Sequence, residues 1–126
     1  MRLNGVYKTI TREEALRLHR EMWTDMQKEL GDNPTPKQRF AFKKVWLDAH
    51  GYSDVNCFCF LCEYAGYDGV IGRCNKCPID WSYLEFSNYF NKKSGTCTGK
   101  YVKNSKEEIY LCATISEILA LPERSE

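Results

Sequence analysis

Two Cys-x-x-Cys pairs, Cys59/Cys62 and Cys74/Cys77, lie in the middle of the chain with eleven residues between them. Two such turns at this separation can place four thiolates around one tetrahedral metal ion. Four sulfur ligands leave Zn²⁺ no open coordination position, so the metal would have a structural role. The spacing therefore predicts a zinc-knuckle-like cluster with Zn²⁺ as structural cofactor.

The identity of the four ligands is left open by the sequence. The two pairs fit the spacing rule best, but Cys97 is an alternative to Cys74, because a ligand from that later segment would tie residues 82–100 to the cluster. Cys57 is expected to pack, and Cys112 lies on the apolar side of a predicted helix, where a small buried side chain is expected. The predicted ligands are four of these five: Cys59, Cys62, Cys74, Cys77 and Cys97.

Other uses of the cysteines are less well supported. The total of seven is odd and the first nineteen residues contain no apolar signal-peptide core, which favours a reducing cytoplasm and metal binding over disulfides. An iron–sulfur cluster is an alternative, although the ferredoxin spacings are missing. A thiol oxidoreductase is a second alternative, but no βαβ pattern surrounds either pair.

Size and composition indicate one domain spanning residues 1–126. Hydrophobic residues make up 43% of the chain and aromatic residues 13%, which is sufficient for a packed core. The formal net charge of +1 argues against a uniformly basic surface for nucleic acid. No apolar stretch is long enough to cross a membrane.

Helix signals cluster before the cysteines and predict a helical hairpin over residues 11–50. Thr11 and Glu14 form a capping-box pattern before a helix expected to run from residue 12 to 30 and to end at Gly31. A second such pattern begins at Thr35, and its helix is expected over residues 36–50, with an apolar stripe formed by Phe42, Val45, Trp46 and Ala49.

Two further regions follow the hairpin. A cysteine-cluster lobe is expected over residues 52–100, in which the alternation of residues 55–60 suggests a short strand leading into Cys59. A third capping-box pattern at Ser105 predicts a C-terminal helix over residues 105–121. The predicted fold class is mainly α, with α+β as the alternative.

The sequence argues against an enzyme. The two histidines, His19 and His50, are expected at the flank of the first helix and at the end of the second, on the surface rather than beside a nucleophile. Glycine spacing between the cysteine pairs lacks the strand–helix context of a phosphate-cradling loop. No catalytic residues are predicted.

Residues 87–106 contain five lysines and no acidic residue, interleaved with aromatic side chains. Cations and aromatic rings together suit ligands that carry phosphates and stack. This loop is therefore a candidate surface for a nucleic acid or nucleotide, and a charged, solvated loop is the simpler interpretation. The candidate ligand-binding residues are Tyr89, Lys92, Lys93, Lys100, Tyr101 and Lys103.

The segments CFLCEYA at 59–65 and CNKCPIDW at 74–81 resemble those of small uncharacterised cysteine-rich proteins encoded largely by phages and prophages of Gram-positive bacteria. The segments TREEAL at 11–16 and ILALPER at 118–124 are also similar, so the resemblance spans most of the chain. It implies no established activity. It implies a small accessory protein in the host cytoplasm, of a kind that often binds and inhibits host or defence factors.

The leading hypothesis is thus a non-catalytic, zinc-stabilised accessory protein that binds a bacterial host or defence protein as a modulator or inhibitor. Binding of a nucleic acid or nucleotide through residues 87–106 is the alternative. The apolar helix stripes could also meet those of a second copy, so a homo-oligomer is a further expectation.

Overall fold

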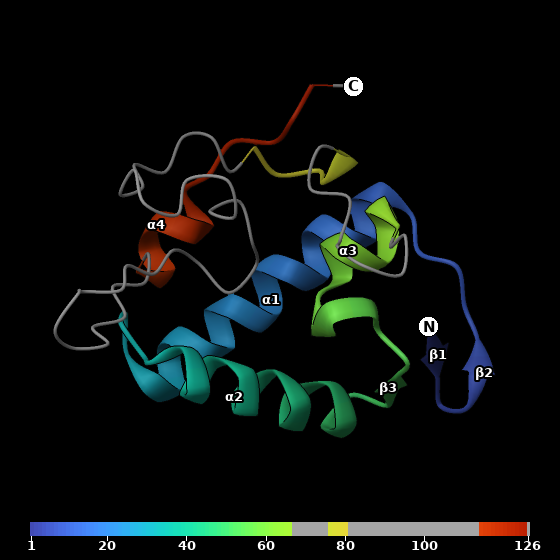
Figure 1. The fold of residues 1–126 in the computed structure, drawn as a ribbon, viewed down its shortest axis with the longest axis horizontal. Helices are drawn as coiled ribbons and strands as arrows, with labels where there is room; N and C mark the ends of the chain where they lie inside the picture. The colour runs from blue at the N-terminus through green and yellow to red at the C-terminus, as the bar shows by residue number, and fades with distance from the viewer. Residues whose placement is uncertain (67–75, 81–113, 126) are drawn as a thin grey trace, which may run out of the picture.

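The computed structural model describes residues 1–66, 76–80 and 114–125 (Figure 1). These residues form a mainly α-helical fold with one small sheet, which confirms the predicted fold class. Within this part of the chain, no helix combines the length and apolarity needed to cross a bilayer.

The two longest helices form the predicted hairpin. Helix α1 spans Arg12–Leu30 and helix α2 spans Pro36–Ala49, and α2 turns back beneath α1 (Figure 1). At the start of α1 the Thr11 hydroxyl accepts a hydrogen bond from the Glu14 N–H at 3.2 Å. The complete capping box of α2 is formed by Thr35 and Gln38, at 2.8 and 3.1 Å. Local capping chemistry thus sets where both helices begin.

Two short helices pack against α1. Helix α3 covers Phe60–Ala65 and follows the 3₁₀ turn η1 (Asn56–Phe58), while helix α4 covers Ile115–Leu119. The strand expected over residues 55–60 is therefore wrong. An alternation of six residues is too short to distinguish a strand from a turn followed by a helix, and the left-handed backbone of Phe58 (φ 50°) breaks any extended path.

The C-terminal helix is shorter than predicted. Thr114 is extended (φ −68°, ψ 158°) and caps α4 through a reciprocal pair of hydrogen bonds with Glu117, so no single helix runs through residues 105–121. Residues 105–113 lie outside the described residues. The capping box that the structure describes in this region is formed by Thr114 and Glu117.

A small sheet closes the end of the hairpin. Strands β1 (Arg2–Leu3), β2 (Val6–Tyr7) and β3 (Tyr52–Ser53) pair antiparallel in the order β2-β1-β3. The Asn4-Gly5 turn has positive φ at both positions, as a tight two-residue hairpin turn requires. The Asn4 side chain approaches Gly51 so closely that an added Cβ would lie 2.2 Å from its Oδ1 atom. A side chain at position 51 would displace the Asn4 side chain, and the positive φ of Gly51 (81°) also favours glycine there.

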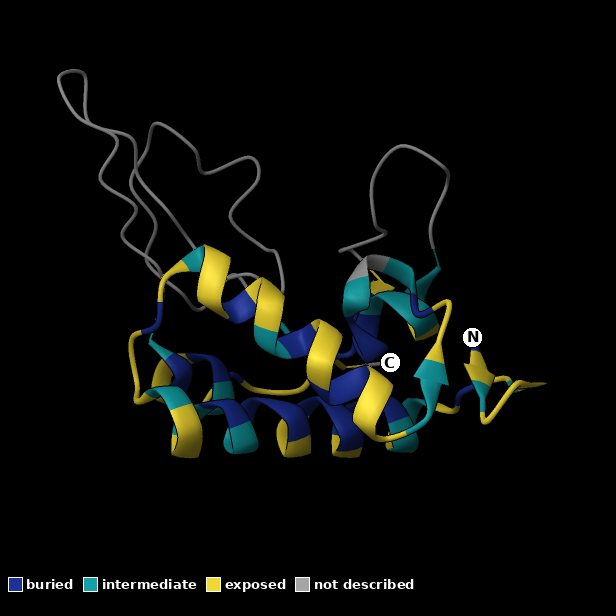
Figure 2. Ribbon diagram, turned by 90° about the horizontal axis from the view of Figure 1, so that it is seen from below, coloured by how far each residue is buried: buried dark blue, intermediate teal, exposed yellow. Residues whose placement is uncertain are grey.

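The core lies between α1, the inner face of α2, α3 and α4. Buried and exposed residues alternate around both long helices, as amphipathic packing requires (Figure 2). Trp46 of α2 also donates its indole N–H to the Asp25 carboxylate of α1 at 2.8 Å. The central buried side chains are Ala15, Leu16, Leu18, Met22, Trp23, Met26, Trp46, Leu47, Phe60, Leu61, Ile79, Ile115 and Ile118.

Asp32 fastens α4 to the end of α1. One of its carboxylate oxygens accepts hydrogen bonds from Gln27 Nε2 at 2.9 Å and from both the N–H and the hydroxyl of Ser116 at 2.8 Å. The Asp32 carbonyl accepts a fourth bond from the Ile115 N–H at 2.8 Å. The hydrogen bonds to the carboxylate, that of Gln27 first and those of Ser116 next, hold the pKa of Asp32 below its ordinary value.

This contact predicts an acid-sensitive attachment of α4. Because the pKa of Asp32 is lower in the folded state, its contribution to stability is fully present above the unfolded-state pKa and is lost as the pH falls through the folded-state pKa. Urea unfolding between about pH 5 and about pH 2 should therefore show a smaller loss of stability in Asp32→Asn than in the wild type. Asp48→Asn, an exposed change on α2, should keep the wild-type slope; equal slopes for the wild type and Asp32→Asn would contradict this assignment.

Candidate metal centre

The first cysteine pair lies at the start of α3. Cys59 is the N-cap residue, with an extended backbone, and Cys62 belongs to the first turn of the helix. The Cys59 carbonyl accepts the Glu63 N–H at 3.0 Å and so closes this turn. A two-residue gap within one turn lets both sulfurs of a Cys-x-x-Cys pair reach one ion. The Cys59 side chain is fully buried, whereas Cys62 is half-buried.

Helix α3 holds this pair firmly against the core. Phe60 and Leu61, the two residues between the cysteines, are both completely buried. The Glu63 carboxylate accepts the Asn56 N–H and contacts the Met1 amino group, both at 3.0 Å. The short helix is therefore anchored on both sides by contacts that do not involve sulfur.

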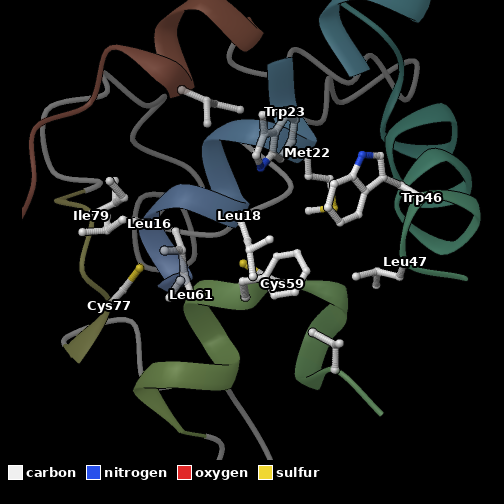
Figure 3. Close-up of a cluster of buried hydrophobic side chains, with 14 of the residues drawn as sticks. Leu16, Leu18, Met22, Trp23, Trp46, Leu47, Cys59, Leu61, Cys77 and Ile79 are labelled. Atoms are coloured by element: carbon white, nitrogen blue, oxygen red, sulfur yellow. The ribbon is translucent and has the colours of Figure 1, made fainter. Parts of the chain in front are cut away.

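The second pair is represented by Cys77, because Cys74 lies outside the described residues. Cys77 is 6% exposed and belongs, with Cys59, to the cluster of buried side chains in Figure 3. The backbone after it pairs with the C-terminal segment: Asp80 N–H donates to the Pro122 carbonyl at 3.0 Å, and Ile79 bridges Glu123. The Arg124 Nε also donates to the Cys77 carbonyl at 3.0 Å. Contacts with residues 122–124 near the C-terminus thus fix the position of Cys77.

Within residues 1–66, 76–80 and 114–125, no three His, Cys, Asp or Glu side chains lie together as a metal-binding group. A four-cysteine set needs Cys74, Cys97 or both, and neither is among the described residues. The donors that are described suit the metal in kind, since thiolates are preferred ligands of zinc. The zinc site therefore stays a prediction. Of its predicted ligands, Cys59 and Cys62 lie within one turn at the start of α3.

No protein-family model matches this chain, and no curated protein or solved structure matches it either. The interpretation of its surfaces therefore depends on its own residues.

The candidate ligand-binding residues belong to a part of the chain that the structure does not describe. Tyr89, Lys92, Lys93, Lys100, Tyr101 and Lys103 all lie outside the described residues. Their proposed role in binding a nucleic acid or nucleotide stays a prediction.

The position predicted for His50 is correct, and the position predicted for His19 is not. His50 caps the C-terminus of α2 as expected and stacks on Trp46, with 3.7 Å between ring centroids. The expected surface position of His19 is wrong, because it is only 1% exposed and packs edge-on against Trp23 at 6.3 Å. His19 lies at helical spacing from the buried residues Ala15, Met22 and Trp23, so it belongs to the buried face of α1.

Two cationic side chains of α2 are buried, which the sequence did not predict. Arg39 and Lys43 of α2 are 0% and 1% exposed, and lie 5.8 and 4.8 Å from the ring centroid of Trp23. Arg39 Nε also donates to the Pro34 carbonyl at 2.9 Å. A positive group over an indole face is attracted by the ring quadrupole, which favours this arrangement in a desolvated setting.

The predicted apolar stripe of α2 is therefore only partly correct. Trp46 is buried and Phe42 half-buried, but Val45 is 69% exposed and Ala49 is also exposed. The inward face is formed by Arg39, Lys43, Trp46 and Leu47. These positions have helical spacing, so the signal was present in the sequence, but a search for an apolar stripe does not count arginine and lysine.

Proposed function

We propose that this chain is a non-catalytic binding protein whose fold is closed by structural Zn²⁺. The metal would be held by four of the five cysteines Cys59, Cys62, Cys74, Cys77 and Cys97. The observation that carries the proposal is the placement of Cys59 and Cys62 within one turn, on a helix that is packed into the core. A thiolate pair on a rigid helix start needs little reorganisation to bind a metal.

The role of zinc in this proposal is structural. When bound, the ion would link α3 to a later segment of the chain, and its binding free energy would become folding free energy. The chain itself would supply the rigid helical hairpin and the surfaces on it. Function would then lie in contact with a partner rather than in chemistry at the metal.

The proposed partner is a protein of a bacterial host, as the resemblance to phage-encoded cysteine-rich proteins suggests. Capture experiments with the tagged, zinc-loaded chain in a Gram-positive lysate test this directly. We expect a stoichiometric protein partner that survives nuclease treatment and is lost when the chain is stripped of metal. Recovery of nucleic acid alone, or of no stoichiometric partner, would contradict the proposal.

A further inference from the structure

Glu63 follows the first cysteine pair directly and is held through both its backbone and its carboxylate. Its N–H donates to the Cys59 carbonyl at 3.0 Å and closes the turn that carries Cys59 and Cys62. One carboxylate oxygen, Oε1, accepts the Asn56 N–H at 3.0 Å, and the other, Oε2, lies 3.0 Å from the Met1 amino group. The Glu63 side chain is only 14% exposed, and the Met1 side chain is fully buried. Glu63 thus joins the cysteine turn to two other segments.

These contacts close a ring that includes the small sheet. Met1 leads directly into β1, and β1 pairs with β3 at the end of the hairpin (Figure 1). The chain then runs from β3 through η1 into α3, where Glu63 returns to Met1. The Asn4 N–H donates to the Gly51 carbonyl at 2.7 Å, which adds a bond just beyond the paired strand residues. Glu63 therefore links the cysteine turn to strand β1.

The Met1 amino group also offsets the negative charge of Glu63. Thiolates and a carboxylate that lie close together disfavour one another's ionised forms, because like charges repel at short range. A carboxylate that is largely buried without a counter-charge is costly, and the amino group supplies that charge at 3.0 Å. The ion pair thus lets a carboxylate hold the turn without adding net negative charge beside the cysteines.

We propose that Glu63 is a positioning residue for the proposed zinc site and couples metal binding there to the docking of β1. This inference rests on the proposed function. Residues that hold metal ligands in place from outside the coordination sphere typically change metal affinity by about 10- to 100-fold when they are replaced. Coupling between two sites is reciprocal, so a metal that fixes the cysteine turn also stabilises the docked strand.

Competition between the full chain and a chelator for Co²⁺ measures the metal affinity, and the thiolate-to-cobalt absorption bands report the ligand geometry. Glu63→Ala should bind Co²⁺ about tenfold more weakly than the wild type, because the turn loses both carboxylate contacts. Glu63→Gln keeps an acceptor for the Asn56 N–H but not the charge that pairs with Met1, so its affinity should lie between those two. Glu29→Ala, an exposed change near the end of α1, should match the wild type.

Hydrogen exchange with and without bound metal separates this coupling from a general loss of stability. Two-residue strands open locally, so exchange at Asn4 reports local rather than global stability. In the wild type, metal should slow the exchange of the Asn4 and Asn56 amides. In Glu63→Ala the effect of metal at Asn4 should disappear, while amides in the middle of α1 keep their wild-type protection.

Two results would overturn the role of Glu63 and leave the zinc proposal standing. One is an equal Co²⁺ affinity of Glu63→Ala and the wild type, and the other is an Asn4 amide that is indifferent to metal in the wild type. A wild type that binds no Co²⁺ would overturn both proposals. If Glu63→Ala does not fold, exchange in the wild type and the affinity of Glu63→Gln decide the question.

Discussion

Replacing Trp23 by alanine is expected to destabilise the fold by about 3–5 kcal/mol, which is typical for removal of a buried aromatic side chain. Trp23 is completely buried in the middle of α1. Its ring contacts His19 edge-on and lies beneath the cations of Arg39 and Lys43. Truncation would leave a cavity and also remove the aromatic surface on which two buried cations lie. Urea unfolding followed by circular dichroism measures the loss.

Two matched variants make the Trp23 result specific. Trp23→Phe retains a ring and should cost distinctly less than Trp23→Ala. Phe40→Ala removes a ring that is 43% exposed and should cost about 1 kcal/mol or less. If Trp23→Ala is no more destabilising than Phe40→Ala, the central place of Trp23 in the core is wrong.

Removal of the proposed zinc ion is expected to have a comparable or larger effect on stability. Structural zinc contributes about 10–16 kcal/mol in peptides that cannot fold without it, and a chain with its own core should depend on the metal for part of that amount. Excess chelator should therefore lower the unfolding midpoint of the wild type and have little effect on Cys62→Ser. We expect Cys62→Ser without chelator to resemble the chelated wild type.

Cys112→Ser is the control for this experiment, since Cys112 is predicted to be a packing residue and not a ligand. It should keep its response to the chelator. A wild type that is insensitive to the chelator, or a Cys112→Ser variant that resembles Cys62→Ser, would contradict the predicted ligand set.

The hairpin could be predicted from the sequence because its signals are local. Thr11, Thr35 and Gly31 act on the backbone within a few residues of themselves, so their patterns alone indicated where α1 begins and ends and where α2 begins. The end of α2 was placed within one residue of its observed position. Such signals need no knowledge of the tertiary fold.

Other features depended on tertiary contacts and were not predicted. Arg39 and Lys43 of α2 lie over the ring of Trp23, which belongs to α1. The sequence of α2 alone does not indicate this contact. The pairing of residues 78–80 with residues 122–124 joins segments more than forty residues apart. Residues 76–78 and 124–125 also line one surface hollow together with Arg12 and Tyr64, a grouping that could not be read from the sequence.

The metal content of the purified chain tests the central claim most directly. Elemental analysis of protein produced with zinc in the medium should give about one zinc per wild-type chain, as one tetrahedral site requires. The double variant Cys59→Ser/Cys62→Ser should contain almost none, and Cys112→Ser should match the wild type. A wild type without zinc, or a double variant that retains it in full, would contradict the account.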